Sequence, residues 1–173
     1  MTFILEILKF TIPGVIVFLT AYFLIKAFME NEQKKREMEL KGKTLSVISP
    51  IKIQAYERLV LFLERINPES LLIRVQTPEM QVHQLHNELL IMIRAEFEHN
   101  LSQQIYVSPQ TWGAIKQTKE HVIKIINTSA SEVNLAAPAS ELSENILRKM
   151  MSLEINPIYI TIGILKQEAG DFI

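Results

Sequence analysis

The chain has no cysteine and only five glycines among its 173 residues. Without cysteine it cannot form disulfides, zinc–thiolate sites or iron–sulfur clusters, and it has no thiol nucleophile. The glycines stand singly, so no glycine-rich loop can cradle a phosphate. The motifs Gly-x-Ser-x-Gly, Gly-x-Gly-x-x-Gly and His-Glu-x-x-His are also missing. The sequence therefore predicts that the protein is not an enzyme, and it predicts no catalytic, cofactor-binding or metal-binding residue.

The chain also has no large excess of acidic over basic residues, or the reverse. Eighteen basic and 19 acidic residues give a formal net charge of -1. A nearly neutral chain has no overall electrostatic attraction to nucleic acid, so we expect no nucleic-acid partner. A length of 173 residues allows one modest domain and excludes a large multidomain enzyme.

Apolar residues make up 48% of the chain and are concentrated at its start, where residues 3–25 read FILEILKFTIPGVIVFLTAYFLI. As a helix, this segment is about 34 Å long, enough to cross a hydrocarbon core of about 30 Å. A cleaved signal peptide needs a basic region before the apolar stretch and a small-residue cleavage site after it, and neither is present. The sequence therefore predicts a retained transmembrane anchor over residues 1–26, with the lipid bilayer as a partner.

Basic residues flank the anchor asymmetrically. Lys26, Lys34, Lys35 and Arg36 follow the uninterrupted apolar run from Phe10 to Ile25, whereas Lys9 is the only basic side chain on its N-terminal side. Because basic residues favour the cytoplasmic side, we expect a single-pass protein of the cell inner membrane. The N-terminus would lie outside and the C-terminal body in the cytoplasm.

Within the anchor, Pro13 and Gly14 are adjacent. The pair allows either a kink or the close approach of another helix at Gly14, and simple lipid exposure is the alternative. Residues 27–46 are rich in helix-forming and charged side chains, which predicts a helical neck that ends near Gly42.

Residues 47–173 predict an all-α body, a compact bundle of about five helices. Five prolines follow residues that cap helices well, a pattern typical of helix starts: Ser49-Pro50, Asn67-Pro68, Thr77-Pro78, Ser108-Pro109 and Asn156-Pro157. Ala137-Pro138 precedes a further helical pattern, and residues 127–137 predict a loop. The segment Ile158–Leu165 has isoleucines at alternate positions, but a lone strand would have no partner, so we expect a helix.

Histidines and glutamates on the segment after Pro78 suggest an alternative function, a metal or small-molecule binder built in a helical bundle. The candidate ligands are Glu79, His83, His86, Glu96 and His99. A di-iron bundle needs a second Glu-x-x-His pair, which the chain does not have. Solvated surface histidines are therefore the simpler interpretation.

Six residues are candidates for protein–protein interaction: Gly14, Tyr56, Arg58, Phe62, Arg65 and Trp112. Most belong to the helix predicted over residues 51–66, which places charges beside a wide apolar surface. Trp is common at binding hot spots, but a single Trp on an apolar stripe is more often a core residue.

The run Gln54-Ala55-Tyr56-Glu57-Arg58-Leu59, continuing to Arg65-Ile66-Asn67-Pro68, resembles a Bacteroidota-type family of uncharacterised bacterial single-pass membrane proteins, a domain of unknown function. The likeness extends from the anchor to the helix that contains His86. The resemblance implies a cytoplasmic helical body on one N-terminal anchor, and it implies no activity.

Together, these features predict a non-enzymatic, membrane-anchored interaction or scaffold subunit of an inner-membrane complex or oligomer. A protein partner or self-association is expected, without a cofactor. The alternative is the helical-bundle metal or small-molecule binding protein.

Overall fold

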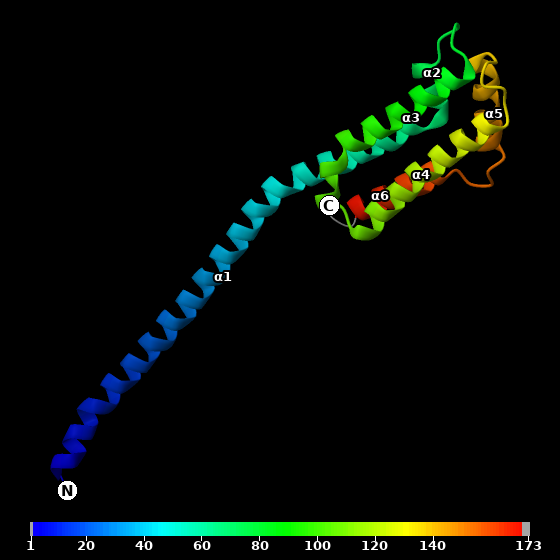
Figure 1. Cartoon of the computed structure of the whole chain (residues 1–173). Coiled ribbons are helices and arrows are strands. Elements are labelled where there is room, and N and C mark those ends of the chain that lie inside the picture. Colours follow the sequence, from blue (N-terminus) through cyan, green and yellow to red (C-terminus); the bar gives the residue numbers. More distant parts are fainter. Residues whose placement is uncertain (1, 171–173) are drawn as a thin grey trace. The chain divides into compact units, whose positions relative to one another are not determined.

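The computed structural model describes residues 2–170, with the side chains of residues 14–36 and 50–170. This range contains α1 (Thr2–Ile66), α2 (Pro68–Val75), α3 (Val82–His99), the short 3₁₀ helix η1 (Leu101–Ile105), α4 (Pro109–Ser131), α5 (Ala139–Met151) and α6 (Pro157–Gly170) (Figure 1). No strand occurs between residues 2 and 170, where the extended structure is a single bridge between Gln81 and Pro138. The predicted all-α architecture is confirmed.

The chain divides into two units, Met1–Ile48 and Ser49–Ile173. In the first unit, one helix is long and apolar enough to span a membrane, over Gly14–Arg36, and none of its most apolar window is buried. The side chains of residues 3–13 of the predicted anchor are not among those that the structure describes. Within the described helix the polar contacts are local, as when Thr20 Oγ1 donates to the Ile16 carbonyl at 2.9 Å.

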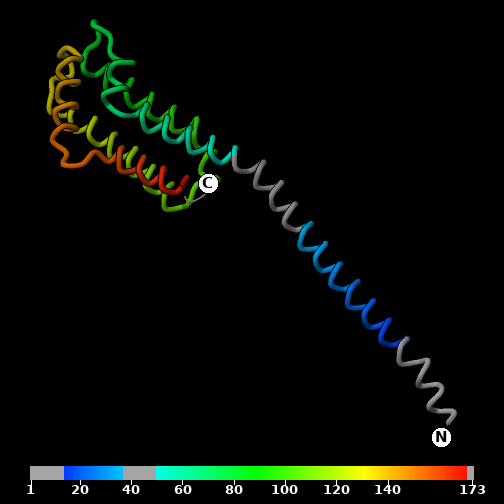
Figure 2. The backbone as a smooth tube through the Cα atoms, turned by 180° about the vertical axis from the view of Figure 1, so that it is seen from behind, coloured from blue at the N-terminus to red at the C-terminus, as the bar shows by residue number. Residues whose placement is uncertain are grey.

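The second unit is the helical body. Its core consists of one cluster of buried side chains contributed by the last turns of α1 and by α2 to α6. α3, α4 and α5 pack against one another, α2 lies against α3 and α5, and α6 lies along α4 (Figure 2). Phe62 of α1, Phe97 of α3 and Trp112 of α4 form a chain of ring contacts with centroid separations of 5.8 and 5.5 Å. The aromatic rings therefore join three helices, at the end of α3 and the start of α4.

Several predicted helix starts are confirmed. α2 begins at Pro68, α4 at Pro109 and α6 at Pro157. At α4 the Ser108 hydroxyl accepts the Thr111 N–H, and at α6 the Asn156 side-chain oxygen accepts the Ile158 N–H at 2.9 Å. These bonds satisfy N–H groups that the first helical turn leaves without a partner. The helix prediction for Ile158–Leu165 is confirmed as well.

Two predicted starts are wrong. No helix begins at Ser49-Pro50, because α1 continues through Pro50 to Ile66, and for the same reason the neck helix does not end at Gly42. A proline inside a helix removes one backbone hydrogen bond, which an otherwise well-formed helix can tolerate at a cost. At Thr77-Pro78 the chain forms a turn, and α3 begins at Val82. There the Gln84 side chain accepts the Gln81 N–H at 3.0 Å and caps the helix.

The predicted loop over residues 127–137 is only partly correct, because α4 continues to Ser131. Ile125, Ile126, Ser129 and Ala130 are buried and extend the apolar stripe of α4 by one turn. Packing of this turn outweighs the low helix propensity of Asn127, Thr128 and Ser129. The loop between α4 and α5 is therefore shorter than predicted.

Candidate functional site

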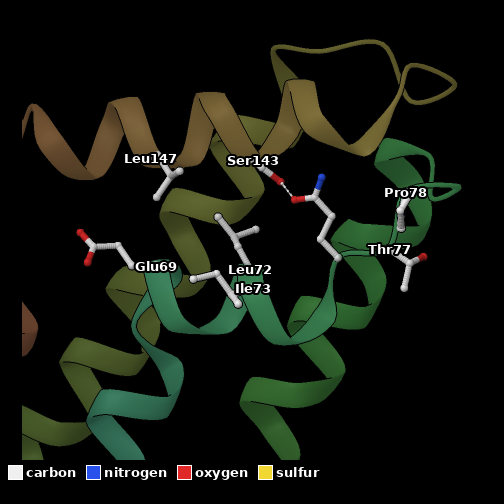
Figure 3. Close-up of a pocket in the computed structure, with 8 residues that line it drawn as sticks. Glu69, Leu72, Ile73, Thr77, Pro78, Ser143 and Leu147 are labelled. Carbon is white, nitrogen blue, oxygen red and sulfur yellow. Dashed lines mark hydrogen bonds between the residues drawn. The ribbon is translucent and has the colours of Figure 1, made fainter.

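An open apolar groove lies between α2 and α5. One wall is formed by one face of α2 and by Gln76 just after it, at positions spaced by three and four: Glu69, Leu72, Ile73 and Gln76. Ser143 and Leu147, one turn apart on α5, form the other wall, and Thr77 and Pro78 close one end (Figure 3). The groove has a volume of about 540 Å³. The space between the two walls is large enough to accept part of another chain segment.

The groove exposes side chains that a soluble surface normally buries. Ile73 is 84% exposed although it lies beside the buried Leu72. Met151, at the end of α5, is also 84% exposed but does not line the groove. Exposed large apolar side chains that line a groove mark a candidate interaction site. These residues make the groove the strongest candidate for a binding surface in the body.

The groove also contains polar groups that could bind an occupant. Ser143 Oγ donates to Gln76 Oε1 at 2.7 Å, which orients the amide and leaves its NH₂ group to donate elsewhere. Glu69, at the α2 wall, is exposed and makes no ion pair within the described part of the chain. An occupant would therefore meet apolar side chains, an amide donor and a carboxylate.

A second polar feature is a partly buried carboxylate. Glu168, near the end of α6, accepts hydrogen bonds from Tyr56 Oη at 3.0 Å, the Ser108 N–H at 2.7 Å and Ser108 Oγ at 2.9 Å. Thr111 Oγ1 donates a further hydrogen bond to the same carboxylate. The cluster joins α1, the N-terminus of α4 and α6, where the positive end of the α4 dipole favours a negative charge.

The pKa values indicate what this cluster can do chemically. Burial would raise the pKa of Glu168, but the hydrogen bonds from Thr111, Ser108 and Tyr56 outweigh burial and hold it below the ordinary value. Burial, together with the neighbouring Glu168, raises the pKa of Tyr56 to about 12. The carboxylate is therefore ionised and occupied by donors at neutral pH. This is a poor arrangement for a general base and a good one for joining helices.

The structure brings three of the predicted interaction residues together. Arg58, Phe62 and Arg65 line a small cavity of about 80 Å³ with Glu96 and His99. Phe62 is buried in the core, whereas both arginines are exposed. Arg65 Nη1 lies 3.0 Å from Glu96 Oε1, and Arg74 Nη1 lies 3.7 Å from the same oxygen. The ion pairs of Arg65 and Arg74 with Glu96 therefore join α1, α2 and α3.

The other predicted interaction residues lie elsewhere. Tyr56 is buried and bound to Glu168, and Trp112 is buried against Phe97, as the core interpretation of this Trp predicts. Gly14 is exposed on the apolar helix, with open space around the position that a Cβ would take.

The candidate metal ligands do not converge. His83 Nδ1 lies 3.2 Å from the Leu135 carbonyl, and His86 Nε2 lies 2.8 Å from Asn127 Oδ1. Glu96 is paired with Arg65 and Arg74. Among the described residues, no group of three histidine or carboxylate side chains is placed to hold a metal ion.

Sequence reasoning missed both the groove and Glu168. The run Leu71-Leu72-Ile73 was a visible signal, because three consecutive apolar residues cover too wide an arc of a helix for one buried face. Leu71 and Leu72 are buried, and Ile73 is left exposed. Glu168 had no such signal. Its partners Tyr56, Ser108 and Thr111 come from distant parts of the chain.

A family model described as "Family of unknown function (DUF7935)" matches residues 2–172. The chain therefore belongs to this family of unknown function, in agreement with the resemblance to an uncharacterised domain. No curated protein and no solved structure matches the chain.

Proposed function

We propose that this member of DUF7935 is a non-enzymatic, membrane-anchored interaction subunit. It spans the inner membrane of a bacterial cell once, with its N-terminus outside, and its cytoplasmic body binds a partner protein within a complex or oligomer. One observation carries the proposal: the chain that contains an exposed apolar helix at Gly14–Arg36 also contains a body with an open apolar groove. Both surfaces are left uncovered by the residues that the structure describes.

The anchor part rests on burial and charge. Large apolar side chains from Val15 to Met29 are exposed, which in water would be costly and in lipid is the stable arrangement. Lys34, Lys35 and Arg36 follow the span, and basic residues favour the cytoplasmic side.

The partner part rests on the groove. An amphipathic helix presents apolar side chains every three or four positions along one face. Such side chains could pack against Leu72, Ile73 and Leu147, which line the groove. Since Glu69 has no cation within the described body, a lysine or arginine on the incoming helix would complete the contact. The proposed occupant is therefore a basic amphipathic helix of a partner protein.

The absence of cysteine makes the orientation directly testable. Single cysteines at Thr2 and at the exposed body residue Ser140 are treated with a membrane-impermeant maleimide in sealed cells. We expect labelling of Thr2→Cys only, and labelling of Ser140→Cys only after the membrane is opened. Labelling of Ser140→Cys in sealed cells would overturn the cytoplasmic placement.

The groove is tested with a photo-crosslinking amino acid at position 73 of the full chain in its native membranes. The matched control is position 91 on α3, where Ile91 is 54% exposed. We expect position 73 to capture a basic helical segment of one protein, and Glu69→Lys but not the control Glu88→Lys to remove the product. Identical products at positions 73 and 91, or insensitivity to Glu69→Lys, would contradict the proposal.

A small-molecule binder is the second candidate, because a volume of about 540 Å³ lies within the usual range of ligand pockets. The same experiment separates the two. Crosslinks from position 73 to a lipid or metabolite, with no protein product, would favour the small-molecule function.

A further inference from the structure

α6 is apolar on both of its faces. Its inner face buries Ile158, Thr161, Ile162 and Leu165 against the body. Its outer face exposes three large side chains: Tyr159 at 55%, Ile160 at 49% and Ile164 at 37%. A helix that is apolar all round is normally covered on all sides. The outer face of α6 is therefore an uncovered surface of the body.

A groove lies between α4 and α6, beside the ridge that Ile160 and Ile164 form on the outer face of α6. Thr118 Oγ1 and Thr161 Oγ1 are 2.7 Å apart and join α4 to α6, and the contact between Glu168 and Thr111 shows that the two helices run antiparallel. The groove has a volume of about 280 Å³. It is lined on one side by Ala114, Thr118 and His121 of α4 and on the other by Pro157, Ile160 and Ile164 of α6. A ridge with a groove beside it is self-complementary, because the ridge of one copy can enter the groove of another.

Gly163 lies in the middle of α6, where glycine costs about 0.5–1 kcal/mol relative to alanine. Within the body nothing requires it, since a Cβ at Gly163 would have no atom within 4 Å. Its backbone is not in the positive-φ region either. A glycine on an exposed apolar face leaves room for the close approach of a second helix.

Charge selects the direction of that second helix. Glu154, before α6, and Lys166, in its last turns, are both exposed, and neither makes an ion pair within the described residues. Ile160 lies midway between them in sequence. Two copies of α6 that cross antiparallel near Ile160 bring each Glu154 to the partner's Lys166, whereas parallel copies place like charges together.

We propose that the outer face of α6 is the interface between two copies of this chain, related by a twofold axis near Ile160. Ile160 and Ile164 of each copy enter the α4–α6 groove of the other, and Gly163 allows the two helices to approach closely. The interface deepens the proposed function, because it specifies the self-association of the anchored subunit. It leaves the α2–α5 groove free for a different protein.

The first experiment uses the cysteine-free full chain in its membranes. Ile160→Cys places one thiol at the proposed axis, and Ile91→Cys is the control on α3, with a similar exposure of 54%. On mild oxidation we expect a dimer that reductant dissolves for Ile160→Cys and none for Ile91→Cys. Equal dimer formation by both variants, or none by Ile160→Cys, would overturn the proposal.

The second experiment measures the dimer of the purified full chain in mild detergent, by light scattering across a dilution series. Gly163→Leu should weaken dimerisation by about tenfold or more because the helices can no longer approach. The same variant should keep or raise the melting temperature of the body, since its Cβ meets nothing there. A destabilised body with an unchanged dimer would contradict the proposed role of Gly163.

A charge swap tests the direction of the pair. Lys166→Glu alone should weaken the dimer a few-fold, and Glu154→Lys in the same chain should restore it. No rescue by the double variant would exclude the antiparallel arrangement. The two proposals fail separately: position 73 reports the different partner, and position 160 reports the second copy.

Discussion

Tyr56 and Glu168 are 112 positions apart in the chain, yet Tyr56 Oη donates to Glu168 Oε1 at 3.0 Å. The bond connects the first helix of the body to the last. Because the same carboxylate accepts the Ser108 N–H at 2.7 Å, it also caps α4. One side chain near the C-terminus thus joins three helices.

Replacing Glu168 by Gln should destabilise the body by about 1–3 kcal/mol at neutral pH, because charge-assisted hydrogen bonds become neutral and one acceptor becomes a donor. The pH dependence should change as well. The pKa of Glu168 is lowered in the folded protein, so the unfolded chain binds more protons once the pH falls below about 4.3. The stabilisation by Glu168 is complete above that pH and lost as the pH falls through its folded-state pKa.

Denaturant unfolding of the full chain in detergent, followed from neutral to acidic pH, measures both effects. Glu168→Gln should show a shallower loss of stability on acidification than the wild type. The exposed Glu88, replaced by Gln, is the control and should behave like the wild type. Parallel pH profiles for the wild type and Glu168→Gln would disprove the role assigned to the carboxylate.

Two buried serines should respond differently to the same substitution. Ser129 Oγ is buried without a hydrogen-bond partner, whereas Ser143 Oγ donates to Gln76 Oε1 at 2.7 Å. Ser129→Ala removes a hydroxyl that is desolvated without compensation, so it should leave stability unchanged or raise it by about 1 kcal/mol. Ser143→Ala should lower stability by about 0.5–1.5 kcal/mol. Thermal melting of the two variants checks the signs, and a destabilised Ser129→Ala would show that its hydroxyl has a partner.

The aromatic chain through the core should be the most sensitive packing site. Trp112 stacks on Phe97 at 5.5 Å, and Lys119 Nζ lies 4.3 Å from the centre of the same Phe97 ring. Trp112→Ala should cost about 3–5 kcal/mol through the cavity it leaves. Lys119→Gln, which removes the charge over the ring and an ion pair with the exposed Glu120, should cost about 0.5–1 kcal/mol. Circular dichroism during denaturation provides the comparison, and similar losses for both variants would contradict this order.

Charges within the exposed apolar helix should release the protein from membranes. Leu19→Arg together with Phe23→Arg adds about 5–7 kcal/mol to the cost of membrane insertion. We expect the wild type to remain in membranes washed with alkaline carbonate and the double variant to appear in the supernatant. Leu19→Ile with Phe23→Leu is the apolar control and should stay in the pellet. Wild-type protein in the supernatant would refute the anchor.

Local signals in the sequence were sufficient for most elements of the body. Ser108 before Pro109 and Asn156 before Pro157 predicted two helix starts because a cap acts within one turn of its own residue. The same signal failed at Ser49-Pro50 and Thr77-Pro78. Whether a proline begins a helix depends on the packing of the chain on both sides of it, which a dipeptide does not specify.

By itself, the sequence determined the apolar helix, the all-α body and the lack of a recognisable catalytic motif, because composition and periodicity act over a few neighbouring residues. Only the tertiary structure decided that Glu168 meets Tyr56 and Ser108, that Glu96 pairs with two arginines, and which apolar side chains stay exposed. Burial is a property of several helices packed together. The faces at Ile73 and Ile160 can therefore be recognised as uncovered only after every other helix has taken its place.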